Sequence, residues 1–134
     1  MKQITEDYVS YETAKLLKEK GFDESVNRFY EIFTGKPSLV RSEYCRNSFT
    51  TSYAAPTLQM TLKWLREIHK IHINLDIHWL HFANQNGWMY VIERILDDGV
   101  DYVDSKGDED DAIFFSTYEE ACERAIKYVL KNLI

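Results

Sequence analysis

The stretch TLQMTLKWLREIHKIHINLDIHW, residues 57–79, changes its apolar periodicity part-way along, and this change decides the fold class. In the first half, apolar residues recur every three or four positions, as on the buried face of a helix. From Ile71 to Trp79, apolar and more polar residues alternate, as on a strand with one buried face. We therefore expect a core-facing helix at about 57–69 that leads directly into a strand.

Two further helices are expected on either side of this stretch. The first, at about 10–20, begins at the capping residue Ser10 and ends before a glycine that suits a left-handed C-terminal position. The last, at about 118–132, follows a capping box formed by Thr117 and Glu120. An unbroken apolar stripe along this last helix indicates that one side of it is buried.

The remaining strand signals are short runs rich in β-branched and aromatic residues. They lie at about 26–33, 39–44, 88–96, 100–103 and 112–115, with an irregular loop at 45–56. We expect an α+β fold in which two or three amphipathic helices pack on a small antiparallel sheet of about four to six strands. The expected order is α-β-β-α-β-β-(β)-β-α, in a single domain over residues 1–134.

The register of the hairpin around the loop at 83–87 stays open. One register places Asp76 opposite Arg94, an opposite-charge pair that suits a sheet face. A slip of one residue exchanges the two faces and places His78 beside Glu93 instead. The order of the strands is equally open.

Composition excludes several classes of protein. The 134 residues carry a net charge of −6, so there is no global excess of cations for binding nucleic acid. The two cysteines are far apart and lack CxxC spacing, which favours a reducing compartment over a disulfide scaffold. No apolar run approaches the length of a membrane span, and no signal peptide is visible. We expect a cytoplasmic protein with no membrane association.

Four clustered histidines, His69, His72, His78 and His81, raise the question of a metal site. His72 and His78 share a strand face but lie about 20 Å apart at a rise of about 3.3 Å per residue. That separation is far too large for one zinc ion, whose ligands lie about 2.0–2.3 Å away. Asp76 and His78, as next neighbours on this face, are the remaining weak candidates.

Other catalytic patterns find no support. The acidic run at 97–111 lacks the ligand spacing of an EF-hand. Cys122 lies on the apolar stripe of the last helix, where a thiol is inert. Cys45 lies beside Arg41 and Arg46, which could favour a thiolate, but no histidine can be placed near it. No nucleotide or cofactor motif is present, so we expect no cofactor and no enzymatic activity.

One local group of cations and aromatic residues suggests a binding surface. Aromatic rings that stack on bases beside cations that hold phosphates are typical of single-stranded nucleic acid binding. The alternative is that the aromatic residues pack inward and the cations only line a solvated helix face. The group comprises Arg41, Tyr44, Arg46, Phe49, Tyr53, Lys63, Arg66 and Lys70.

Three blocks of sequence carry a resemblance to a known family: ITEDYVSYETAKLLKEKGFDE, APTLQMTLKWLREIHKIHI and FFSTYEEACERAIKYVLKNLI. The chain resembles small uncharacterised proteins from phages and mobile elements of gut Bacteroidales bacteria. The resemblance implies a bacterial or phage-encoded cytoplasmic protein and transfers no catalytic residues. Residues 25–55 and 80–112 depart most from the family pattern, so we expect specific recognition to lie there.

Three functions follow as hypotheses. The first is a non-catalytic phage or mobile-element accessory protein that binds a protein partner, including a second copy as a homodimer, because Tyr and Trp are favoured at interfaces. The second is a nucleic-acid-associated protein that uses the group from Arg41 to Tyr53. The third is a metal-binding protein or enzyme built around Asp76 and His78.

Overall fold

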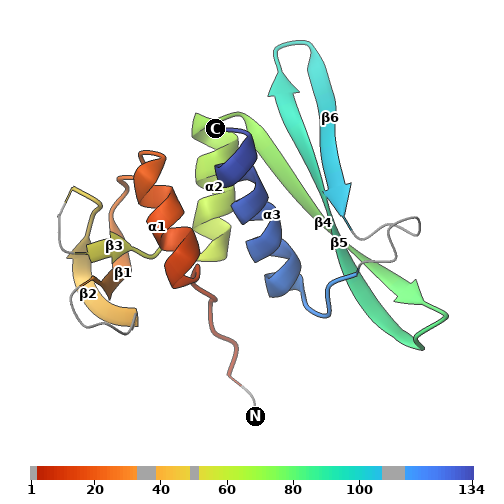
Figure 1. Cartoon of the computed structure of the whole chain (residues 1–134), viewed down its shortest axis with the longest axis horizontal. Helices are drawn as coiled ribbons and strands as arrows, with labels where there is room; N and C mark the ends of the chain where they lie inside the picture. The colour runs from red at the N-terminus through yellow and green to blue at the C-terminus, as the bar shows by residue number, and fades with distance from the viewer. Residues whose placement is uncertain (1–2, 33–38, 49–51, 107–113) are drawn as a thin grey trace. The chain divides into compact units, whose positions relative to one another are not determined.

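Three helices and six strands follow one another along the part of the chain that the computed structural model describes, residues 3–32, 39–48, 52–106 and 114–134 (Figure 1). They are α1 (Tyr11–Glu19), β1 (Val26–Glu31), β2 (Leu39–Cys45), β3 (Ser52–Ala54), α2 (Leu58–Ile68), β4 (Ile71–Leu80), β5 (Gln85–Leu96), β6 (Gly99–Lys106) and α3 (Tyr118–Asn132). The expected α+β class and element order are confirmed. The strands form two antiparallel three-stranded sheets, ordered β2-β1-β3 and β4-β5-β6.

The contacts of the chain divide it into two compact units. Unit 1 comprises residues 1–60 and 127–134, and unit 2 comprises residues 61–126. Each three-stranded sheet belongs to one unit, and the long helices α2 and α3 contribute residues to both.

In unit 1, α1 is capped at both ends as the sequence predicts. The Oγ of Ser10 accepts a hydrogen bond from the backbone N–H of Thr13 at 3.3 Å. Past the C-terminus, Gly21 adopts φ +88°, and the Phe22 N–H donates to the carbonyl of Leu17 at 2.9 Å. Phe22 and Leu17 are both fully buried, so the cap also closes the apolar core of this unit.

The sheet of unit 1 is extended by irregular chain on one side. Strand β3 is only three residues long, and the sequence alone indicates a loop there. The chain beyond it continues the pairing, because the Ala55 N–H donates to the Arg28 carbonyl at 2.9 Å. Tyr8 and Thr57 then form an isolated antiparallel bridge. The segment around Tyr8 therefore covers what would otherwise be an open sheet edge.

In unit 2, β4, β5 and β6 form a long antiparallel ribbon (Figure 1). Strand β4 pairs with β5 without a break, from Ile71 opposite Arg94 to Leu80 opposite Gln85. This register is neither of the two that the sequence suggested, because the turn occupies residues 81–84 rather than 83–87. The turn closes early because Asn84 adopts φ 51°, a left-handed conformation that asparagine tolerates.

Strand β6 is longer than the expected 100–103, since its pairing with β5 continues past a register shift between Ile92 and Glu93. Of the strand expected at 112–115, residues 112 and 113 lie outside the described part of the chain. Phe115 forms a bridge with Trp88, with both backbone hydrogen bonds at 2.8–2.9 Å. Its ring also stacks on Tyr90 at a centroid distance of 5.9 Å.

The core of unit 2 lies on one face of its sheet. Side chains at the start of β4, Ile71 and Ile73, are buried together with Ile92 of β5. The neighbouring helical segments contribute further buried side chains: Leu62, Trp64, Leu65, Ala121, Cys122, Ala125 and Ile126. This burial is the physical reason for the period-two pattern of the strand and the three-to-four pattern of the helices.

Candidate protein-binding surface

The far end of the β4–β5 hairpin exposes large apolar side chains that the core does not cover. Ile77 is 53% exposed, Trp79 is 51% exposed and Phe82, in the turn, is 77% exposed. We call these three residues the hairpin patch. Ile77 and Trp79 share one face of β4, whereas the ring of Phe82 lies 6.5 Å from that of Phe114. Exposed aromatic and aliphatic side chains gathered at one end of a hairpin are typical of protein–protein contact sites.

The register of the hairpin explains why the patch is exposed. Ile71, Ile73, Leu75, Ile77 and Trp79 all share one face of β4, as the alternation of the sequence predicts. The first two of them are buried, whereas the last two extend past the region that the core covers. The same apolar row therefore serves the core at one end and faces solvent at the other.

Strand β4, which carries Ile77 and Trp79 of the patch, is also an edge strand. Among the described residues, β4 forms ladder pairs only with β5, so its other edge has no backbone partner in the sheet. Exposed edges invite pairing with another chain, and proteins usually block them with Lys, Pro, a bulge or a short strand. Strand β4 is ten residues long, has no register shift against β5 and contains neither Lys nor Pro.

The opposite edge of the same sheet differs in two of these respects, the register shift and the presence of a lysine. Strand β6 begins at a glycine, carries Asp101, Asp104 and Lys106, and pairs with β5 through a register shift. In unit 1, β1 and β2 also pair through a register shift, and the outer strand β2 carries the exposed residue Arg41. Of these three edges, β4 alone has no register shift against its neighbour and carries no Lys or Arg; Asp76 is its one carboxylate.

Polar groups occupy the other face of β4 from His72 to His78, and the last residue on this face, Leu80, is buried. Asn74 Nδ2 donates to Asp76 Oδ1 at 3.2 Å, and His72 lies directly opposite Glu93. His78 has a ring contact with Phe114 at a centroid distance of 6.3 Å. This face therefore offers hydrogen-bonding groups with few formal charges, which is compatible with contact to a protein surface.

The metal-binding candidates gain no ligand from the neighbouring strand. Met89 lies opposite Asp76, and Gly87 lies opposite His78. Neither residue supplies the oxygen or nitrogen ligand that zinc would need beside these two. Within the described ranges, no group of three or more His, Cys, Asp or Glu is arranged to hold a metal ion.

His69 lies apart from the other histidines, between α2 and β4. Its ring packs edge-on against Trp64 at a centroid distance of 4.6 Å. The Nε2 atom is buried and has no hydrogen-bond partner in the described structure. Burial consequently lowers the pKa of His69 below its usual value of 6.5.

The cations and aromatic residues proposed for nucleic acid binding are partly engaged within unit 1. Arg46 Nε donates to the Asp23 carbonyl at 2.9 Å. The Tyr53 ring packs edge-on against Tyr11 at 5.5 Å, and the ammonium group of Lys18 lies over it at 5.5 Å. A ring held between these neighbours does not present an open face for stacking on a base.

The rest of that group is divided between the two units and the part of the chain that the structure does not describe. Arg41 is exposed and lies opposite Arg28 in the β1–β2 ladder. Lys63, Arg66 and Lys70 belong to unit 2. Phe49 and the side chain of Tyr44 lie outside the described part of the structure, as does the acidic segment at 107–113.

Both thiols are buried, and this corrects the expectation for Cys45. Burial raises the pKa of Cys45, and the hydrogen bond to Ser52 and the positive charge of Lys18 lower it by less. The prediction that Arg41 and Arg46 favour the thiolate of Cys45 is wrong. Arg41 is exposed to solvent, and Arg46 donates a hydrogen bond to the Asp23 carbonyl. Cys122 is fully buried, and burial raises its pKa to about 12.

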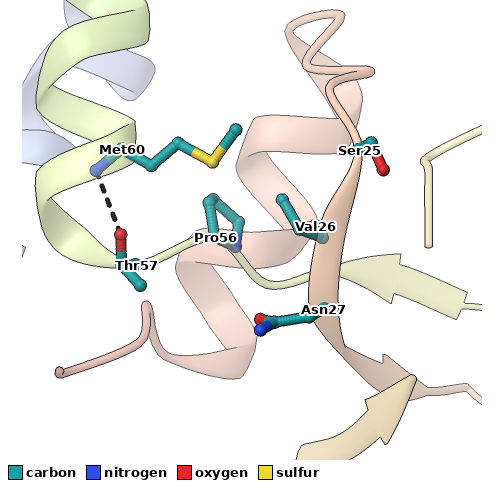
Figure 2. Close-up of a pocket in the computed structure, with 6 residues that line it drawn as sticks. All are labelled: Ser25, Val26, Asn27, Pro56, Thr57 and Met60. Atoms are coloured by element: carbon teal, nitrogen blue, oxygen red, sulfur yellow. Dashed lines mark hydrogen bonds between the residues drawn. The ribbon is translucent and has the colours of Figure 1, made fainter. Parts of the chain in front are cut away.

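A shallow hollow of about 320 Å³ lies in unit 1 (Figure 2). Val26, Pro56 and Met60 face it, and the polar side chains nearby are those of Ser25, Asn27 and Thr57. Thr57 Oγ1 already accepts a hydrogen bond from the Met60 N–H at 3.1 Å, as the cap of α2. No charged side chain lines the hollow, so it provides no group to orient a charged substrate.

Comparison of the chain with protein-family models, with curated proteins and with solved structures finds no match. Among the helices that the structure describes, none combines the length and apolar character needed to cross a membrane.

Proposed function

We propose that this protein is a non-catalytic accessory protein that binds a protein partner through the end of the β4–β5 hairpin. The observation that carries the proposal is the exposure of Ile77 and Trp79 on β4 and of Phe82 in the turn that follows it. Among the described residues, β4 has a ladder partner on one edge only. Exposed apolar side chains supply the energy of association, and open backbone groups supply orientation. An origin in a phage or mobile element, which the sequence resemblance implies, belongs to the same proposal.

The location of the patch supports this function over the two alternatives. Phe82 lies within residues 80–112, the second stretch that departs from the family pattern. The aromatic side chains of the patch are exposed, whereas Tyr53 of the proposed nucleic-acid group is covered by Tyr11 and Lys18. Asp76 and His78 lack a third ligand on β5.

Affinity capture with matched variants tests the proposal. Tagged wild-type protein is compared with a Trp79→Lys/Phe82→Lys variant, in a lysate that also contains an untagged copy of the chain. A Val100→Lys variant is the control, because Val100 is 59% exposed but lies at the other end of the sheet. A partner that binds the wild type and the control, but not the patch variant, and that binds again when purified, supports the proposal. Identical capture by all three proteins contradicts it.

A further inference from the structure

The outer edge of β4 has the residue pattern needed to pair with itself. We propose that the partner is a second copy of this chain, and that two β4 strands pair antiparallel about a two-fold axis at Leu75. The sheet of unit 2 would then continue from one copy into the other. This inference rests on the proposed function and specifies both the partner and the register.

A two-fold axis perpendicular to the sheet pairs each residue with the residue of the second copy that lies equally far from the axis on its other side. The two side chains of such a pair lie on the same face of the sheet. With the axis at Leu75, Ile73 lies opposite Ile77 of the second copy, and Ile71 lies opposite Trp79. The exposed half of each apolar row is thereby placed beside the buried half of the other. Cross-strand apolar pairs of this kind are the unit from which sheets gain stability.

The polar face is complementary in the same register. Asn74 lies opposite Asp76 of the second copy, so an amide donor faces a carboxylate acceptor. The amide of Asn74 has two N–H groups, and only one is needed for its hydrogen bond to Asp76 of its own chain. His72 lies opposite His78, and no two like-charged carboxylates or ammonium groups face each other.

The neighbouring registers are less favourable. An axis at Asp76 places two carboxylates directly opposite each other, which is destabilising on a sheet face. An axis at Asn74 pairs only residues 71–77 of β4 and leaves Trp79 beyond the end of the partner strand. The register at Leu75 pairs residues 71–79 and includes both exposed large apolar side chains of β4, Ile77 and Trp79.

Sedimentation of the pure full-length chain tests whether the dimer exists. At micromolar concentration we expect a species of twice the chain mass of 15.9 kDa. Trp79→Lys should raise the dissociation constant roughly tenfold or more, because it replaces an interface aromatic residue by a charge, with an unchanged circular dichroism spectrum. Val100→Lys should sediment as the wild type does. A monomeric wild type, or a dimer that Trp79→Lys leaves intact, overturns the inference.

Single cysteine substitutions test the register. Only the residue on the two-fold axis lies opposite its own copy, within the reach of a disulfide. Leu75→Cys should therefore cross-link on mild oxidation more completely than Asn74→Cys or Asp76→Cys, while the native thiols stay shielded by burial. Preferred cross-linking through position 74 or 76 overturns the register.

If the wild type is monomeric but the capture experiment yields a patch-dependent partner of another kind, the dimer is refuted and the proposed function stands.

Discussion

Ile77 lies directly opposite Trp88 in the β4–β5 ladder, yet the two side chains have different surroundings. Ile77 is 53% exposed, whereas the ring of Trp88 packs edge-on against Tyr118 at a centroid distance of 5.4 Å. The N–H and the carbonyl of Trp88 are both hydrogen-bonded to Phe115, at 2.8 and 2.9 Å, so its pair with Ile77 is a non-hydrogen-bonded one. The hairpin therefore ends in a firmly held strand beside an exposed one, an arrangement that presents a binding surface without disturbing the core.

This arrangement predicts opposite consequences for two tryptophans. Trp88→Ala should lower the free energy of unfolding by about 2 kcal/mol or more, because it removes a packed aromatic side chain. Trp79→Ala should change it by less than about 0.5 kcal/mol, as expected for an exposed side chain. Chemical denaturation at a concentration too low for association measures both. Equal losses in the two variants would contradict the assignment of Trp79 to an open surface.

A second prediction concerns the packing of the hairpin against the segment at Phe114. A Cβ atom at Gly87 would lie 2.6 Å from Leu80 Cδ1 and 2.8 Å from Phe114 Cβ. Gly87→Ala should therefore destabilise the protein by about 1–3 kcal/mol through overpacking. Gly99→Ala is the matched control, because nothing lies within 4 Å of its Cβ position. Thermal unfolding of both variants checks the prediction, which an unaffected Gly87→Ala protein would refute.

The two cysteines should be unreactive in the native protein. Burial raises the pKa of both thiols, and that of Cys122 reaches about 12. At mildly alkaline pH the thiolate fraction is therefore small, and a thiol reagent has little access. We expect very slow reaction with a chromogenic disulfide in buffer and rapid reaction of two thiols in denaturant. A native thiol that reacts as fast as free cysteine would be inconsistent with this structure.

His69 should make the protein sensitive to mild acid. Its pKa is lowered by burial in the folded state, so the unfolded chain takes up the proton more readily. Stability is complete above the unfolded value of about 6.5 and falls as the pH drops from there to the lowered pKa. A His69→Gln variant should lose less stability than the wild type over this interval. Parallel pH profiles of the melting temperature in the two proteins would count against this role.

Much of the fold could be predicted from the sequence because its signals are local. The cap residues of α1 and the capping box before α3 lie within a few positions of the helix ends they specify. The bounds of α3, Tyr118–Asn132, agree with the prediction. The alternation in β4 is likewise a property of adjacent residues.

The parts that the sequence did not predict depend on distant contacts or on rare backbone conformations. Strand β3 exists because β1 pairs with it, and its three residues carry little signal of their own. The hairpin register followed from the left-handed conformation of Asn84. Exposure of Ile77 and Trp79 depends on where the core ends, which the alternating pattern does not indicate.

Hydrogen exchange of the β4 backbone as a function of protein concentration tests the central claim most directly. Amides of β4 that face the open edge should become protected as the concentration rises, because they gain carbonyl partners in the second copy. Amides of β6 should show the same exchange at every concentration. We predict concentration-dependent protection confined to the β4 edge and the hairpin patch. Exchange in β4 that is independent of concentration, with protection elsewhere or nowhere, would contradict the account.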